Sequence, residues 1–201
     1  VRLSSDGGSL EKIRQSISYG DVWVPIEPSS KQSANAEAVN IVVWADLSSG
    51  FLSTVVENLQ QLPKEDVNLD FRPWFDPDDD RSANLAKALV VANMHGFGLE
   101  AILGVADVPA EDRTVALVKA RLQPHGIDDA GWEGAMKEAT SSVEQGRALG
   151  AKLGVRASPT YFINGYRLRG AQSKRAVVRL FALEKWDSSN PLGPTPQTGA
   201  Q

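Results

Sequence analysis

A nearly continuous apolar run at residues 40–44 (NIVVW) limits how this chain can fold more than any other feature. A strand without polar alternation must be buried on both faces, as a central strand of a sheet is. Residues 46–50 supply turn and capping residues, and residues 52–62 repeat apolar side chains at the spacing of an amphipathic helix. Residues 67–71 alternate like a half-buried strand. The sequence therefore predicts a β-α-β unit over residues 41–71.

A helical block and a hairpin follow this unit. Helical character extends over residues 83–95, 99–103, 112–122 and 130–153. We expect the last of these helices to be interrupted. Residues 160–163 and 166–168 have strand character, and Asn164-Gly165 between them is the strongest short signal for a hairpin turn.

The two ends of the chain are simpler. Residues 173–186 form the final predicted helix, and residues 187–201 are rich in Pro, Gly, Ser and Thr, which predicts a flexible tail. Near the start, residues 10–18 are a short helical candidate. Residues 22–24 are a short strand that the following proline ends or confines to an edge.

Two stretches of sequence are more specific than this layout. Residues 41–56 read IVVWADLSSGFLSTVV, and residues 153–172 read LGVRASPTYFINGYRLRGAQ. They resemble the two signature segments of the DsbA-like thioredoxin-fold family. In that family a buried strand leads into Cys-Pro-x-Cys at the start of a helix, and a later segment carries a cis-proline and Phe-Ile-Asn-Gly. The resemblance covers residues 21–183, including a first strand and linker upstream of residue 40.

The resemblance implies a fold class and a domain layout. We expect an α/β, thioredoxin-like fold with a helical insertion at about residues 77–147. One such domain would occupy residues 1–186, and the flexible tail would occupy residues 187–201. The known work of this family also implies an extracytoplasmic location, in the bacterial periplasm or cell envelope.

The chain departs from the family at the residues that perform the redox chemistry. With Asp46 aligned on the family's aspartate, the Cys-Pro-x-Cys positions are held by Ser49, Gly50, Phe51 and Leu52. The chain has no cysteine at all. Disulfide exchange needs an attacking thiolate and a second thiol, and neither serine nor leucine can form a mixed disulfide. We infer that this chain is not a disulfide oxidoreductase and has no catalytic residues of that kind.

Two origins of the missing cysteines stay open. The chain could be an oxidoreductase relative in which the cysteines were lost naturally, or one in which they were replaced by mutation. Leu52 is a poor choice for a deliberate replacement and extends the apolar helix face with Val55 and Val56. The pattern therefore favours natural loss. A further alternative is that the chain is part of a larger protein whose other domain keeps the cysteines.

The second signature segment predicts a peptide-binding groove. In the family, the cis-proline loop lies opposite the first turn of the active-site helix, and the backbone of the residue before the proline is free to pair with an extended peptide. The candidate groove residues are Ser49, Phe51, Leu52, Ser158, Pro159 and Thr160. The expected function is a redox-inactive module that binds or scaffolds a polypeptide or partner protein. The alternative is that Pro159 only shapes the start of a strand.

An enzymatic alternative concerns Ser49. Kappa-class glutathione transferases and related isomerases resemble this fold and have serine at the same position, although their motif resembles Ser-Pro-Tyr-Ser rather than residues 49–52 of this chain. Under this hypothesis Ser49 polarises the thiol of bound glutathione at a helix N-terminus. Otherwise Ser49 is a turn or capping hydroxyl, and no cofactor is expected.

Charge and composition narrow the partners. A net charge of −4, a pI near 5.3 and no Arg/Lys block argue against nucleic acid. No apolar run approaches the roughly 20 residues of a membrane helix, and the chain does not open with a signal-peptide pattern. We therefore expect no membrane insertion, and we expect that any signal peptide has been removed or never existed. No motif specifies an oligomeric state.

Metal binding is not expected either. The acidic run at residues 76–80 lacks the glycine and glutamate of a calcium loop, so it is better interpreted as a loop that leads into a helix N-terminus. His95 and His125 are far apart in sequence and have no third ligand.

Overall fold

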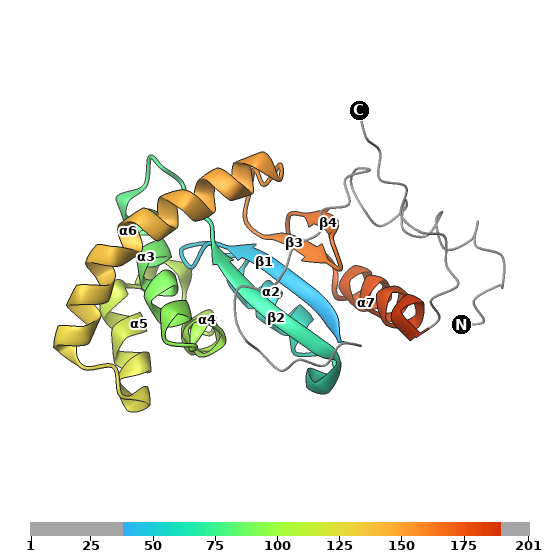
Figure 1. The fold of residues 1–201 in the computed structure, drawn as a ribbon, viewed down its shortest axis with the longest axis horizontal. Helices are drawn as coiled ribbons and strands as arrows, with labels where there is room; N and C mark the ends of the chain where they lie inside the picture. Colours follow the sequence, from blue (N-terminus) through green and yellow to red (C-terminus); the bar gives the residue numbers. More distant parts are fainter. Residues whose placement is uncertain (1–37, 190–201) are drawn as a thin grey trace.

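The computed structural model describes residues 38–189, and a four-stranded mixed sheet lies at its centre (Figure 1). The strand order is β2-β1-β3-β4. β1 (Val39–Ala45) pairs in parallel with β2 (Val67–Pro73) and antiparallel with β3 (Thr160–Ile163). β3 in turn pairs antiparallel with β4 (Tyr166–Arg169). The predicted α/β class and the β-α-β unit are confirmed.

The central position of β1 explains its apolar sequence. Every residue of β1 except Asn40 is buried. Ile41 and Val43 belong to the main core, whereas Val42 and Trp44 join a second, smaller cluster with Phe162 on the opposite face. A strand that contributes to two cores cannot alternate with polar residues.

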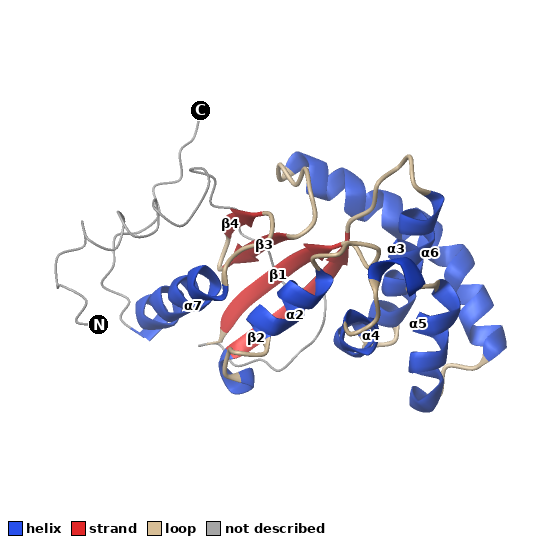
Figure 2. Cartoon of the chain, turned by 180° about the vertical axis from the view of Figure 1, so that it is seen from behind, coloured by secondary structure: helices blue, strands red, loops and turns tan. Residues whose placement is uncertain are grey.

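Two helices cover the main-core face of the sheet. α2 (Leu52–Leu59) makes the crossover between β1 and β2, followed by a 3-10 turn at Lys64–Asp66, and α7 (Lys174–Ser189) follows the hairpin. Both helices lie on the same side of the sheet (Figure 2). Their apolar residues bury the sheet against one continuous core.

Four helices lie between β2 and β3 and pack together beside one end of the sheet (Figure 1). They are α3 (Asp80–Met94), α4 (Gly98–Ala106), α5 (Val115–Leu122) and α6 (Asp129–Lys152), with 3-10 turns at Ala110–Asp112 and Gln123–His125. Their buried side chains continue the main core. The long helix α6 brings the chain back to the sheet at the start of β3.

Two helix predictions need correction. α6 is a single helix of 24 residues, not an interrupted one. Its buried residues Trp132, Ala135, Ala139 and Val143 recur every three or four positions, and this packing outweighs the low helix propensity of its glycines. The helix expected to begin at residue 112 begins at Val115 instead. Thr114 caps it by accepting a hydrogen bond from the Leu117 N–H at 3.2 Å.

The last helix reaches Ser189, which is further than expected, whereas the hairpin is confirmed. Asn164 and Gly165 both have positive φ angles, 45° and 87°, as a two-residue hairpin turn requires. The Asn164 side chain also accepts a hydrogen bond from the Asn40 N–H at 2.9 Å, which ties the turn to β1. The expected helix at residues 10–18, the strand at residues 22–24 and residues 190–201 of the expected tail lie outside the described residues.

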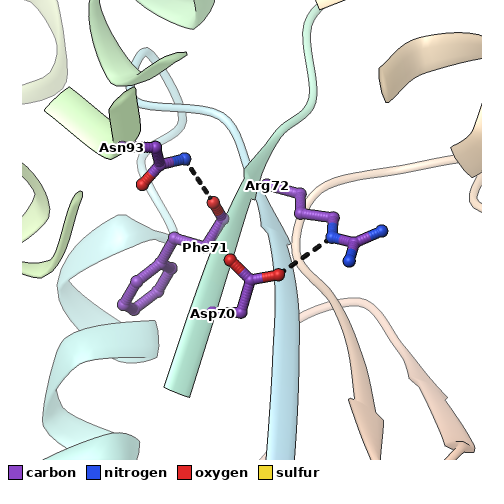
Figure 3. Close-up of polar contacts among 4 residues, drawn as sticks. All are labelled: Asp70, Phe71, Arg72 and Asn93. Atoms are coloured by element: carbon purple, nitrogen blue, oxygen red, sulfur yellow. Dashed lines mark hydrogen bonds and ion pairs between the residues drawn. The ribbon is translucent and has the colours of Figure 1, made fainter. Parts of the chain in front are cut away.

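β2 illustrates how the two faces of the sheet differ (Figure 3). Phe71 points toward the helices, and its carbonyl accepts a hydrogen bond from the Asn93 side chain of α3 at 2.7 Å. Asp70 and Arg72 point to the opposite face and form an ion pair at 2.9 Å. The Arg72 guanidinium also lies 5.1 Å from the centre of the Trp44 ring. The second face therefore carries charged residues around a small aromatic cluster.

A pair of glycines in α6 tests this packing. A Cβ at Gly150 would lie 2.9 Å from Nε1 of the buried Trp44, whereas a Cβ at Gly146 would have no neighbour within 4 Å. Gly146→Ala should raise the free energy of unfolding by up to about 1 kcal/mol through helix propensity. Gly150→Ala gains the same propensity but loses about 1–3 kcal/mol to overpacking, so its net effect should be destabilising. Urea denaturation measures both, and equal stabilisation would contradict the packing.

Candidate functional site

Two loops meet where β1 ends and β3 begins. Because these strands are antiparallel neighbours, Trp44 lies opposite Thr160, and the loop after β1 faces the loop before β3. The backbone N–H of Asp46 donates a hydrogen bond to Ser158 Oγ at 2.8 Å. The structure thus brings together the two segments that the sequence singled out.

The Asp46 carboxylate organises the first loop. Its Oδ1 accepts hydrogen bonds from the Ser48 N–H at 2.8 Å and the Ser48 hydroxyl at 2.7 Å. Its Oδ2 accepts from the hydroxyl of Ser82 in α3 at 3.1 Å. Asp46 and Ser82 are both buried. A buried carboxylate is tolerated here because three donors satisfy it.

Arg113 holds the same loop from the other side. Its side chain is only 2% exposed, and its guanidinium donates hydrogen bonds to the carbonyls of Leu47 at 3.0 Å and Ser49 at 2.7 Å. The remaining donors reach the carbonyls of Val108 and Ala106. The planar fork of an arginine is suited to bridging several acceptors in this way.

The electrostatic setting of Arg113 follows from its burial. Burial lowers the pKa of Arg113, and the neighbouring Arg81 lowers it further, while Asp46 and Glu111 act in the opposite direction. Arginine nevertheless stays protonated in proteins. The site loop is therefore fixed by a buried carboxylate and a buried cation.

The four residues at the Cys-Pro-x-Cys positions differ in exposure. Ser49 is half-buried, and its hydroxyl oxygen accepts a hydrogen bond from the Phe51 N–H at 3.2 Å, so it serves as a turn residue. Gly50 is exposed, and Phe51 is 54% exposed at the start of α2. Leu52 is only 1% exposed and packs in the core. Leu52 therefore cannot line a groove as expected, because the apolar face of α2 turns it inward.

The second loop contributes Ser158, Pro159 and Thr160. The Ser158-Pro159 peptide bond is cis. Pro159 and Thr160 are buried, and the Thr160 hydroxyl donates a hydrogen bond to the Ala157 carbonyl at 2.7 Å. Thr160 therefore shapes the loop from within and offers no side-chain surface to a ligand.

Ser158 itself is half-buried. Its hydroxyl is held by Asp46, yet within residues 38–189 its backbone N–H and carbonyl form no hydrogen bond. Ser158 therefore combines partial exposure of the residue with open backbone hydrogen-bonding capacity in the described chain.

The remaining sequence candidates have structural roles. Asp79 in the acidic run caps α3 by accepting a hydrogen bond from the Arg81 N–H, which confirms the capping interpretation. His95 follows the last turn of α3, and His125 packs on the Phe97 ring at 4.5 Å. Over the described range, no group of three or more potential ligands could hold a metal ion. No helix within that same range is long and apolar enough to cross a membrane.

Sequence reasoning missed two residues that build the site, Arg113 and Ser82. Both are polar residues with polar neighbours in the sequence, for which a surface position is the usual expectation. Their partners are 64 and 36 residues away, at Ser49 and Asp46 respectively. No local pattern in the sequence could have identified them.

Comparison with known proteins establishes the fold. The chain is similar to a thioredoxin-like oxidoreductase from Silicibacter pomeroyi, with 21% identity and a TM-score of 0.59 over 74% of this chain and 90% of that one. It is similar to α-DsbA1 from Wolbachia pipientis, with 12% identity and a TM-score of 0.66 over 84% and 97%. It is also similar to oxidised BdbD from Bacillus subtilis, with 16% identity and a TM-score of 0.63 over 83% of this chain and 100% of that one.

These similarities confirm the predicted DsbA-like, thioredoxin-type fold and the resemblance drawn from the two signature segments. No protein-family model and no curated protein sequence matches the chain. The absence of cysteine agrees with a DsbA-like fold that has lost its Cys-x-x-Cys motif.

Arg113 provides a stability test of the site. Arg113→Ala removes the donor of the Leu47 and Val108 carbonyls, whereas the Ser49 and Ala106 carbonyls keep the Leu52 N–H and the Ser53 hydroxyl. Each lost hydrogen bond costs about 1–3 kcal/mol if the carbonyl stays unsatisfied, so the free energy of unfolding should fall by at least about 2 kcal/mol. Arg175→Ala removes the same side chain from an exposed position of α7 and should change it by less than about 0.5 kcal/mol. Denaturant unfolding compares the two, and similar small effects would contradict the role of Arg113.

Proposed function

We propose that this chain is a redox-inactive polypeptide-binding module, in which the loop at Ser158 holds an extended segment of a partner protein. The observation that carries the proposal is that Ser158 is only half-buried and that its backbone N–H and carbonyl have no hydrogen-bond partner in the described chain. An extended peptide can satisfy both groups by adding a short strand.

The absence of cysteine supports a function other than disulfide exchange. Exchange begins when a thiolate attacks a disulfide, and it ends when a second thiol resolves the mixed disulfide. Ser49 has no comparable acidity or nucleophilicity, and Leu52 is buried and has no reactive atom. A polypeptide that enters the site can therefore bind and leave without a change in its disulfides.

The apolar contact for such a peptide would come from Phe51. Phe51 is 54% exposed and lies where the loop after β1 leads into α2. The same loop contains Asp46, whose N–H donates a hydrogen bond to Ser158 Oγ. Exposed aromatic residues are favoured at protein interfaces because they bury a large area with few rotatable bonds. Phe51 alone therefore offers the apolar surface that the sequence predicted for Phe51 and Leu52 together.

The rigidity of the two loops favours binding. Asp46, Ser82 and Arg113 fix the backbone around the site through buried hydrogen bonds. A receptor that is already ordered loses less conformational entropy when it binds a peptide. The polar network thus serves the binding site, in addition to stabilising the fold.

We also propose that the protein works outside the cytoplasm, in the cell envelope, because its fold resembles that of the DsbA-like family. Fractionation of source cells that produce the tagged full-length protein should recover it from the envelope or periplasmic fraction. Recovery with a cytoplasmic marker would contradict this part of the proposal.

The first functional prediction concerns redox activity. The purified chain should not accelerate insulin reduction by dithiothreitol, because it cannot form a mixed disulfide. The double variant Ser49→Cys, Leu52→Cys places thiols at the two family positions and serves as a comparison for assay sensitivity. Turnover by the unmodified chain would contradict the proposal.

The second functional prediction concerns Phe51. Calorimetric titration should detect binding of an extended, unstructured peptide, and Phe51→Ala should weaken it by about tenfold or more through lost apolar burial. Met94→Ala removes an apolar side chain that is 51% exposed at the far end of α3 and should leave the affinity unchanged. Equal effects of both changes would argue against a site at Phe51.

Glutathione separates the proposal from the transferase alternative. A polypeptide-binding module needs no glutathione site, so the proposed function predicts no saturable heat when reduced glutathione is titrated into the protein. Saturable binding that is lost in Ser49→Ala would favour the glutathione-dependent enzyme instead.

A further inference from the structure

Three arginines lie next to the Ser158 loop on the second face of the sheet. Arg156 precedes Ser158 by two residues. The strand register places Arg169 opposite Thr160 and Arg167 opposite Phe162. Since Thr160 follows Pro159 directly, Arg169 belongs to the strand position nearest the loop. The surroundings of the loop on this face are therefore basic.

Arg167 and Arg169 also converge on a single point of the chain. Gly154 has a φ of 73°, and a Cβ at this glycine would collide with Nη1 of Arg167 and lie 3.8 Å from Nη2 of Arg169. The glycine thus makes room for two neighbouring guanidinium groups. The positive charges of these two groups repel each other.

No acidic residue of the described chain neutralises this group. Asp70, on the same face, is paired with Arg72 at 2.9 Å (Figure 3). Arg167 donates a hydrogen bond to the Leu153 carbonyl at 2.8 Å, and its buried Nε has no partner. Within the region that the structure describes, Arg156 and Arg169 form no ion pair.

The environment of Arg167 destabilises its positive charge. Burial lowers the pKa of Arg167, and the proximity of Arg169 lowers it further. A carboxylate placed beside both groups would remove the repulsion and supply the missing acceptors. An acidic ligand would therefore be stabilised here more than at an isolated surface arginine.

A small cavity on the second face of the sheet offers space for a carboxylate of the ligand. It has a volume of about 190 Å³ and is lined by residues that include Trp74, Arg147 and Arg156. Arg147 reaches it from α6, where it also pairs with Glu144 at 3.0 Å and lies 5.8 Å from the Phe75 ring. The cavity therefore combines aromatic walls with positive charge.

We propose that the polypeptide bound at Ser158 is acidic, with carboxylate side chains that pair with Arg156 and Arg169. This inference rests on the proposed function and specifies its ligand. Successive side chains of an extended peptide point to opposite sides. Those on the arginine side would be acidic, and those on the other side would contact Phe51, so the preferred sequence alternates acidic and apolar residues.

The chemistry favours an acidic polypeptide over nucleic acid. A nucleic-acid site needs a longer track of cations along a phosphate backbone than these three arginines provide. Three arginines beside unpaired backbone groups suit a ligand that brings both carboxylates and peptide N–H and C=O groups.

The test uses three labelled peptides that alternate valine with aspartate, asparagine or lysine, titrated into the full chain by fluorescence anisotropy. We expect the aspartate peptide to bind about tenfold more tightly than the asparagine peptide at low salt. The preference should shrink as salt rises. Arg156→Ala and Arg169→Ala should each reduce it, whereas Lys137→Ala, at an exposed position of α6, should not.

The outcomes separate this inference from the proposed function. Equal binding of the aspartate and asparagine peptides would overturn the acidic preference and leave peptide binding in place. If none of the three peptides bound, the proposed function would fail together with the inference. Displacement of the aspartate peptide by an equal concentration of single-stranded oligonucleotide would overturn the assignment of an acidic polypeptide. Circular dichroism of each arginine variant checks that it is folded.

Discussion

The hydrogen bond from the Asp46 N–H to Ser158 Oγ joins two loops that are 112 residues apart in sequence. The helices α3 to α6 all lie between these loops in sequence, so the site joins segments from both sides of the helical insertion. The Asp46 carboxylate accepts a hydrogen bond from the Ser82 hydroxyl of α3. The Arg113 guanidinium donates a hydrogen bond to the Ser49 carbonyl of the same loop. In the DsbA-like fold this region supports two cysteines. Here it supports a serine turn and an exposed phenylalanine.

The proposed binding function rests on three features of the site that do not involve thiols. The Ser158 backbone offers a donor and an acceptor, Phe51 offers apolar area, and the arginines offer positive charge on the second face of the sheet. Each feature suits an extended polypeptide, and none requires a thiol. We propose that the molecule is a DsbA-like domain that binds polypeptide at this surface without disulfide chemistry.

The sequence predicted those parts of the structure that local patterns determine. The apolar run of β1, the alternation in β2 and the Asn164-Gly165 turn each identified an element, because burial on two faces, burial on one face and positive φ have distinct signatures. It could not predict that Arg113 is buried, because only tertiary hydrogen bonds explain a buried guanidinium. Leu52 was placed in the groove by the family resemblance, although the apolar face that it shares with Val55 and Val56 packs it in the core.

The central claim is that the Ser158 backbone pairs with an extended acidic peptide. The most direct measurement is NMR of the isotope-labelled chain, with the Ser158 amide followed as the valine–aspartate peptide is added. The account predicts that this amide shifts on saturation and that its hydrogen exchange slows, because a new hydrogen bond protects it. Saturable peptide binding that leaves the Ser158 amide unshifted and unprotected would contradict the account.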